Sequence, residues 1–297
     1  MQFFKKQKRT RSFDLLSSYS FYRPDIKGVL ILLLLFLAGQ LVGSLILMLL
    51  IAVMDAETAL TYGTVIAYPV SFIPAMIYAS VKSRTNACFS ETPGVPLDKG
   101  HFGSAGALKL AFAASLATLA MAVAVDPLND LLPEMSLQLK NAMERLMDGP
   151  LWLTLLSVSI FAPFFEEWLC RGMILRGLLG KMKPLWAILV SALVFGLIHG
   201  NIWQGIPATI IGALFGYVYW KTGSLKMTML MHCVNNTFSV IMSKADRFSD
   251  AETFRELFPT TGQWLILYVT CLLILALFFL SVEKHIKARK QLKAEAE

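Results

Sequence analysis

Long apolar blocks are the feature that most constrains how this chain can fold. Hydrophobic residues make up 56% of its 297 positions and charged residues only 16%, and the apolar residues lie in long runs. A run of about eighteen or more apolar residues can cross the roughly 30 Å hydrocarbon core of a bilayer as a helix. A soluble domain of this size would need more charge to cover its surface. The sequence therefore predicts an all-α integral membrane protein.

The apolar blocks predict a bundle of about eight transmembrane helices in one membrane domain, residues 28–283. The predicted spans are 28–54, 59–81, 104–125, 150–170, 184–200, 205–221, 224–243 and 261–283. Three prolines within them predict bends, and a GxxxG pair predicts close helix packing: Pro69, Pro74 and Pro207, and Gly212 with Gly216. Helical spacing of apolar residues within 126–149 predicts a short amphipathic helix, either on the outer interface or packed on the bundle.

Basic residues gather at the two ends of the chain, in segment 1–27 and tail 284–297, and account for much of the net charge of +7. These clusters flank apolar blocks, which is typical of positive-inside anchoring and not of a nucleic-acid-binding face. An even number of spans places both termini on one side. The predicted cytoplasmic loops agree, because they carry Lys82, Arg84, Lys99, Arg171, Arg176, Lys181, Lys183, Lys221 and Lys226. We expect cytoplasmic termini, the bilayer as surroundings and no nucleic-acid partner.

Ionisable groups at membrane depth are costly, so each is a candidate for function. Three apolar blocks carry them: Glu166-Glu167-Trp168-Leu169-Cys170-Arg171, Phe195-Gly196-Leu197-Ile198-His199, and His232-Cys233-Val234-Asn235-Asn236. On a helix, Glu167 and Arg171 share a face and can pair. Glu166 points roughly 100° away from Glu167 and is left to face the bundle interior.

The third block obeys the same geometry, because His232 and Asn236 share a face. Phe195 stands one turn before His199 and could pack on its imidazole or on a substrate. The predicted spans place His199 and His232 at depths that differ by roughly 10 Å. A sunken turn at 200–205 would relieve this mismatch.

Two mechanisms suit this set of side chains. In the first, which we favour, Glu166 and His199 deprotonate a water that attacks a peptide carbonyl, and His232 and Asn236 donate to the oxyanion. In the second, a divalent metal such as zinc is held by Glu166, His199 and His232, with Glu167 or Asn236 assisting. The chain lacks the HExxH pattern that would favour zinc.

The ordered trio EExxxR, FxxxH and HxxxN resembles the CPBP family, which comprises type II CAAX prenyl endopeptidases and bacterial bacteriocin-processing and abortive-infection-like relatives. The resemblance covers roughly 104–243. It implies an eight-helix intramembrane endopeptidase in which Glu166 and His199 activate water while His232 and Asn236 form the oxyanion site; Glu167, Arg171 and Phe195 complete the motifs. Members have often been described as metalloproteases.

The resemblance also implies a substrate class, namely membrane-associated peptides or proteins. Eukaryotic members trim prenylated CAAX proteins, whereas the short loops of this chain favour a prokaryotic plasma-membrane protein that uses other substrates. Relatives of that kind are associated with peptide maturation and bacteriocin self-immunity. Since a fold does not guarantee its chemistry, a non-catalytic immunity or scaffold protein is the alternative.

Overall fold

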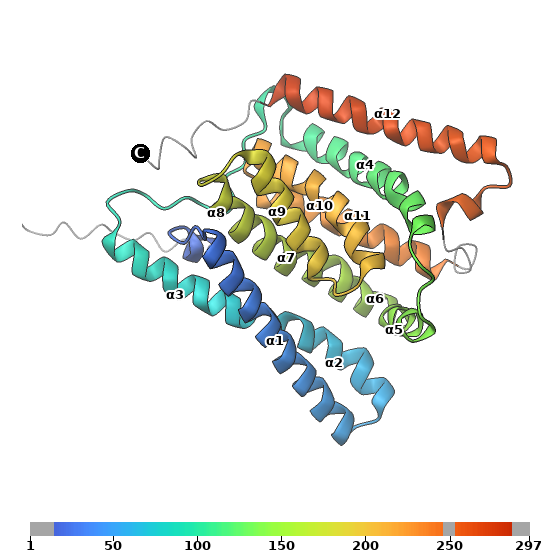
Figure 1. The fold of residues 1–297 in the computed structure, drawn as a ribbon, viewed down its shortest axis with the longest axis horizontal. Coiled ribbons are helices and arrows are strands. Elements are labelled where there is room, and N and C mark those ends of the chain that lie inside the picture. Colours follow the sequence, from blue (N-terminus) through green and yellow to red (C-terminus); the bar gives the residue numbers. More distant parts are fainter. Residues whose placement is uncertain (1–14, 246–252, 287–297) are drawn as a thin grey trace, which may run out of the picture.

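The computed structural model describes residues 15–245 and 253–286, and this part of the chain is helical, with no β-strand (Figure 1). Its α-helices are α1 (Ile26–Val53), α2 (Ala56–Val70), α3 (Ile73–Phe89), α4 (Ala107–Val125), α5 (Leu137–Met147), α6 (Leu151–Thr154), α7 (Ala162–Glu167), α8 (Arg176–Leu179), α9 (Pro184–Leu197), α10 (Ile202–Thr222), α11 (Leu225–Lys244) and α12 (Thr261–His285). Short 3-10 helices are η1 (Leu15–Tyr19), η2 (Gly103–Ala105), η3 (Asp126–Leu131) and η6 (Phe254–Leu257), and π-helices are η4 (Leu155–Phe161) and η5 (Trp168–Leu175). The predicted all-α class is confirmed.

Six helical units are long and apolar enough to cross a bilayer in the part of the chain that the structure describes. They are Ile26–Val53, Ala56–Phe89, Ala107–Leu131, Leu151–Leu179, Ile202–Thr222 and Thr261–His285. The chain is therefore a multi-pass membrane protein. Helix α9 is a shorter apolar helix, and α11, which holds the histidine and asparagines of the third motif, is not among the six. The total of eight crossings and the cytoplasmic termini stay predictions, and most residues of both basic clusters lie outside the described residues.

The second span is interrupted close to Pro69 and Pro74, where bends were predicted, and consists of two helices. Helix α2 ends one residue after Pro69, and α3 starts with Pro74 in its first turn. Helix α1 crosses this break closely, since a Cβ at Gly39 would overlap the carbonyl oxygen of Ser71. In contrast, α10 continues through Pro207 as one helix.

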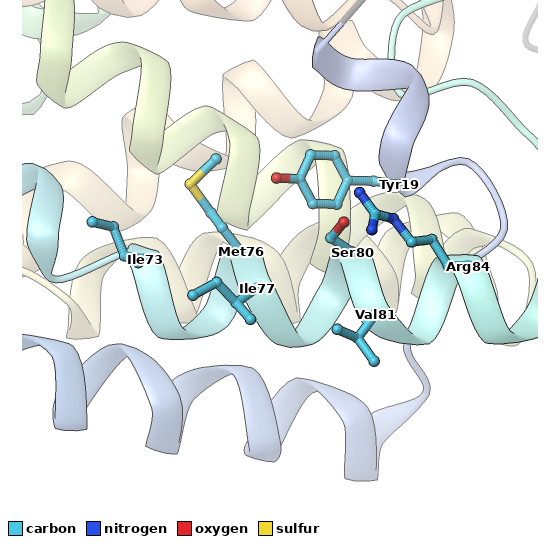
Figure 2. Close-up of a pocket in the computed structure, with 7 residues that line it drawn as sticks. All are labelled: Tyr19, Ile73, Met76, Ile77, Ser80, Val81 and Arg84. Carbon is cyan, nitrogen blue, oxygen red and sulfur yellow. The ribbon is translucent and has the colours of Figure 1, made fainter.

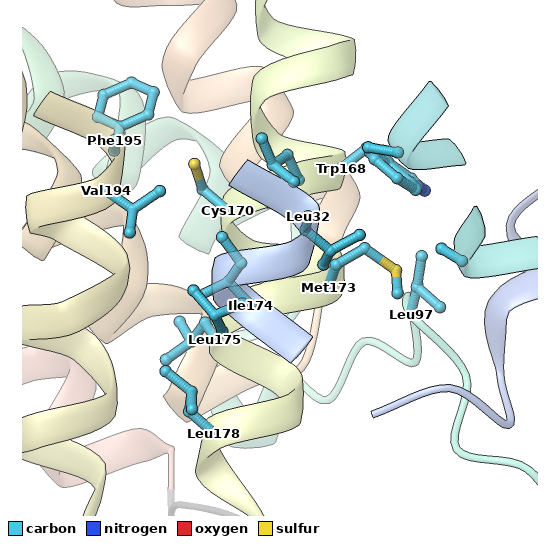
Figure 3. Packing of buried hydrophobic residues seen from close by; sticks show 14 of the residues in the cluster. Leu32, Leu97, Trp168, Cys170, Met173, Ile174, Leu175, Leu178, Val194 and Phe195 are labelled. Atoms are coloured by element: carbon cyan, nitrogen blue, oxygen red, sulfur yellow. The ribbon is translucent and has the colours of Figure 1, made fainter. Parts of the chain in front are cut away.

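The unit from α6 to α8 is the centre of the bundle. It is one helical run in which α and π stretches alternate, and every residue from Glu166 to Leu179 is buried. Figure 3 shows apolar side chains of this run packed between α1 and α9, with Leu32 on one side and Val194 and Phe195 on the other.

The central unit extends further than the sequence predicted. The fourth span was expected at 150–170 with Arg171 and Arg176 in a cytoplasmic loop; instead the helix runs to Leu179 and both arginines are buried. Burial is tolerated because Arg176 is saturated by carbonyls: its Nε donates to Gly172 at 2.7 Å and its Nη2 to Tyr19 at 3.0 Å. These contacts tie the N-terminal η1 segment to α8.

The remaining helices cover the other side of the central unit. Helices α9 and α10 pack on each other, and α12 lies along α4 (Figure 1). The GxxxG prediction is confirmed, because a Cβ at Gly212 would lie 2.9 Å from the Phe195 ring and one at Gly216 3.1 Å from Ile188. The amphipathic helix predicted within 126–149 is α5.

On the opposite edge of the bundle, Tyr19 lies over α3 (Figure 2). Together they line a shallow groove formed by Tyr19, Ile73, Met76, Ile77, Ser80, Val81 and Arg84. The groove is separate from the motif residues, none of which lines it.

Candidate active site

The two glutamates lie at the end of α7, where the α-helix passes into the π-helix η5. Glu166 is 7% exposed and Glu167 is fully buried. π-Helical stretches are rare and occur frequently at functional sites. Since a buried carboxylate is costly unless it is paired or hydrogen-bonded, the partners of each glutamate define what it can do.

Glu167 is held by two basic side chains. Arg171 Nη1 donates to Glu167 Oε1 at 2.7 Å, which confirms the pairing expected from their spacing. His232 Nδ1 lies 3.1 Å from the same oxygen. Arg171 Nη2 also donates to the Gly212 carbonyl at 2.8 Å. Glu167 is therefore a fixed member of a buried polar network that joins α7, η5, α10 and α11.

Aromatic rings enclose this network. The guanidinium carbon of Arg171 lies 4.4 Å from the centroid of the Phe195 ring and 5.4 Å from that of Phe215. His232 contacts the same two rings, with centroids 5.2 Å and 5.7 Å away. The rings keep the charged groups away from lipid and favour the cation over their faces. Phe215 is a contributor that no motif pointed to.

Glu166 has different surroundings. The hydroxyl of Tyr68 on α2 donates to its Oε1. Its Oε2 lies 3.9 Å from His232 Nε2 and, within the described residues, has no hydrogen-bond partner. A single water could bridge two polar atoms at this separation. Sequence reasoning missed Tyr68, because an aromatic residue in an apolar span carries no signal of the partner 98 positions away.

His232 thus connects the two glutamates. Its ring is 3% exposed, with Nδ1 towards Glu167 and Nε2 towards Glu166. A neutral imidazole carries one N–H, and a protonated imidazole carries two. Only the protonated ring can donate a hydrogen bond towards Glu167 and another towards Glu166 at the same time.

His199 lies just beyond the end of α9, in the turn before α10. Its Nδ1 is 2.7 Å from the Phe195 carbonyl. A carbonyl can only accept, so this bond assigns the proton to Nδ1 and leaves Nε2 of the neutral ring as an acceptor. The turn is fixed by Asn201, which caps α10 through Gln204 N and donates to the His199 carbonyl at 3.1 Å.

The two histidines flank one aromatic ring. Both imidazoles lie with centroids 5.2 Å from that of Phe195, in edge-on contact. The two imidazoles, which the predicted spans set at different depths, therefore both contact one side chain. Among the hydrogen bonds and ion pairs of the described residues, none joins His199 to Glu166.

Asn236 is turned towards the first π-helix. Its Nδ2 donates to the Val158 carbonyl at 2.8 Å, and Asn235 Nδ2 donates to its Oδ1 at 3.1 Å. Pro163, five residues after Val158, has no N–H to offer a preceding carbonyl. The local backbone therefore presents an acceptor that Asn236 satisfies, which separates the role of Asn236 from that of Asn235.

A metal does not fit the resting arrangement. In the part of the chain that the structure describes, no three His, Cys, Asp or Glu side chains lie close enough to hold an ion. Ligation by Glu166, His199 and His232 stays a prediction that this geometry does not favour, and we derive no step through a metal.

Comparison with known proteins agrees with the motifs. Residues 148–238 match the family described as type II CAAX prenyl endopeptidase Rce1-like. A Bacillus subtilis (strain 168) protein named "Putative membrane peptidase YdiL" is 31% identical over 90 residues, which is 30% of this chain and 37% of that protein. No solved structure matches the chain. The predicted resemblance to the CPBP family is confirmed, over a segment that contains all three motifs and ends before α11 does.

Proposed function

We propose that this chain is an intramembrane endopeptidase that hydrolyses peptide bonds of membrane-associated peptides or proteins. The observation that carries the proposal is the environment of Glu166. It is a carboxylate within a membrane bundle, with one oxygen held by Tyr68 and the other facing His232 Nε2 at 3.9 Å. A buried carboxylate that a hydroxyl orients through one oxygen, and whose other oxygen accepts no hydrogen bond among the described residues, is suited to act as a general base. The resemblance to Rce1-like endopeptidases supports the same chemistry.

In the proposed reaction, Glu166 and His199 together orient one water. Glu166 accepts a proton from the water while the water oxygen forms a bond to the carbonyl carbon of the peptide. His199 assists through Nε2, the ring nitrogen left unprotonated by the bond to Phe195. The proton then passes to the amide nitrogen as the carbon–nitrogen bond breaks, which yields a carboxylic acid and an amine. Apo enzymes often hold such groups apart and bring them together only in the complex with substrate.

The developing oxyanion needs donors placed in advance. We assign this role to His232 and Asn236, which lie one turn apart on α11. Protonated His232 can keep Nδ1–H on Glu167 while Nε2–H faces the reaction centre. Asn236 uses one amide N–H on Val158 and retains the second. The Glu167–Arg171 pair supports the His232 ring and takes no proton.

The substrate reaches this site within the membrane, because the site is built from helices of the apolar bundle. We infer a membrane-associated peptide or protein as substrate and the plasma membrane of a prokaryote as location. The similarity to a bacterial membrane peptidase supports the location.

The test compares membrane-peptide profiles, by mass spectrometry, of cells that carry the wild-type chain, Glu166→Gln or the matched control Glu57→Gln. Glu57 is an exposed glutamate in the first turn of α2. We expect cleavage products in the wild type and the control, and a loss of about 10²- to 10⁴-fold with Glu166→Gln. His199→Ala should lose activity similarly. Unchanged products in Glu166→Gln cells that keep the protein's biological effect would instead support a non-catalytic immunity or scaffold protein.

A further inference from the structure

One contact reaches the site from a part of the chain that lies outside the matched segment 148–238. The Tyr68 hydroxyl on α2 donates to Glu166 Oε1. Tyr68 is half-buried, and its hydroxyl, the one polar group of the side chain, donates to the Glu166 carboxylate. The N-terminal helices therefore supply a partner to the group that the proposed reaction uses as its base.

Tyr68 stands where the second span breaks. Pro69 follows it directly, α2 ends at Val70 and α3 starts at Ile73. A proline near a helix end removes a donor and fixes the backbone. The last turn of α2, which carries Tyr68, lies against α7 of the central unit, and α3 continues the span beyond the break (Figure 1).

Packing holds this break in place from both sides. On the side of α1, Gly39 lets the helix backbone touch the Ser71 carbonyl. On the side of α7, the Phe72 ring stacks on Phe165 with centroids 5.4 Å apart. The Tyr68 ring meets the edge of Phe72 at 5.5 Å. The hydroxyl is consequently presented at a fixed place, next to the residue that precedes Glu166.

Binding one carboxylate oxygen determines where the other points. With Oε1 on Tyr68, Oε2 of Glu166 is left towards His232 Nε2, 3.9 Å away. Without the hydroxyl, the carboxyl group could rotate about its last bond, because that torsion is broad and roughly two-fold. A base misplaced by about 1 Å can lose about a hundredfold in rate.

We propose that Tyr68 is a positioning residue, which acts through Glu166 by fixing the orientation of its carboxylate for water activation. This inference rests on the proposed endopeptidase function. It adds that the reaction depends on the α1–α3 unit, so the segment 148–238 is not a sufficient catalytic unit. The role belongs to the hydroxyl and not to the ring, which packs on Phe72.

The experiment uses the full chain purified in detergent, with kcat and KM measured on a peptide substrate taken from the membrane-peptide profiles. Tyr68→Phe keeps the ring and removes the hydroxyl. Tyr62→Phe is the matched control, since Tyr62 lies on the same helix and is 46% exposed. We expect Tyr68→Phe to lower kcat about tenfold to a hundredfold, with KM within about twofold of the wild-type value. The control should keep both constants.

Other outcomes overturn the inference. Full kcat in Tyr68→Phe with a loss only in Tyr68→Ala would mean that the ring packs and the hydroxyl is idle. A rise in KM at unchanged kcat would mean that Tyr68 contacts substrate instead of positioning the base.

A thermal-unfolding cycle separates failure of this inference from failure of the proposed function. Tyr68→Phe, Glu166→Leu and the double variant are compared by the shift of the unfolding midpoint, which needs no activity; leucine is used here because glutamine would keep an oxygen that accepts from the Tyr68 hydroxyl. If the hydroxyl holds the carboxylate, the two shifts are not additive. Full activity of Glu166→Gln would overturn the proposed function and catalytic positioning together, while the cycle would still report the bond. Additive shifts together with an inactive Glu166→Gln would overturn the inference alone.

Discussion

The helices at the rim of the bundle and the helices at its centre bury different kinds of side chain. In the most apolar 18-residue stretch of each spanning unit, 28% of the residues of α1 and 22% of those of α12 are buried. The corresponding share is 50% in both Leu151–Leu179 and α10. The rim exposes large apolar side chains such as Leu41 and Leu280, whereas the centre encloses glutamates, arginines and a histidine. Lipid solvates the first kind and cannot solvate the second, so the central helices must supply partners of their own. The buried ionisable side chains of the first and third motifs therefore lie at the centre.

The Tyr68–Glu166 bond crosses this division. The α1–α3 unit is apolar and lipid-facing over most of its length, yet it supplies one polar contact to the centre. Substitutions in three places test this contrast between centre and rim: in the Glu167–Arg171 pair, at Asn236, and where α1 packs on the break between α2 and α3.

The largest effect is expected from Arg171→Ala. The change removes the arginine partner of Glu167, which is 0% exposed, and the donor to the Gly212 carbonyl. Breaking a buried ion pair on one side destabilises a protein by about 3–5 kcal/mol. The free energy of unfolding of the purified chain, measured by denaturant titration in detergent, checks this.

The matched control is Lys226→Ala. Lys226 pairs with Asp98 at 3.5 Å, but its side chain is 78% exposed. A solvent-exposed pair contributes about 0–1 kcal/mol, so the control should lose no more than that. Equal losses at Arg171 and Lys226 would show that the centre does not depend on internal pairing, and the contrast between centre and rim would not hold.

A somewhat smaller effect is expected from Asn236→Ala, which lowers the rate and also leaves the Val158 carbonyl without its donor. Removal of one oxyanion donor lowers kcat by about 10²- to 10³-fold. Asn235→Ala is the control, because within the described residues the Asn235 side chain bonds to Asn236 Oδ1, whereas the Asn236 side chain bonds to the Val158 carbonyl. We expect this control to retain at least about a tenth of wild-type kcat. Steady-state kinetics of both variants decide the matter, and the assignment of the two asparagines is wrong if Asn235→Ala is the more damaging.

Local geometry explains which parts of the site the sequence could predict. The Glu167–Arg171 bond follows from an i,i+4 spacing on one helix, which needs no knowledge of the fold. The same reasoning separated Glu166 from Glu167 and placed His232 and Asn236 on one turn. Apolar block length likewise predicted the all-α membrane class.

Contacts between distant segments were beyond such reasoning. His232 meets Glu167 across 65 positions, and Tyr68 meets Glu166 across 98. Neither follows from spacing, because the register between two helices depends on how they pack. The π-helices η4 and η5 were also missed, since apolar periodicity predicts a helix without showing its hydrogen-bond pattern. The fourth span was predicted to end too early for another reason: Arg171 and Arg176 were assigned to a cytoplasmic loop, whereas partners from the fold allow both to be buried.

The smallest effect in this series is expected from Gly39→Ala, which tests how the rim reaches the centre. Alanine is the better helix former by about 1 kcal/mol, so an exposed position would gain stability. At Gly39 the new Cβ would overlap the Ser71 carbonyl oxygen, and α1 must move away from the break between α2 and α3. Overpacking of this kind costs about 1–3 kcal/mol. Unfolding free energies measured beside those of Gly262→Ala check this, because a Cβ at Gly262 meets nothing within 4 Å.

The kcat of the Gly39→Ala variant tests whether the packing of α1 affects the site. The three atoms nearest to a Cβ at Gly39 all belong to Ser71, beside the break that carries Tyr68. If α1 packing sets the hydroxyl in place, kcat falls in Gly39→Ala and remains at the wild-type value in Gly262→Ala. In a Tyr68→Phe background the same glycine substitution should cause little further loss of kcat, since the hydroxyl it would displace is already gone. A loss of stability with unchanged kcat would instead separate the rim from the chemistry and leave the α1–α3 unit as packing alone.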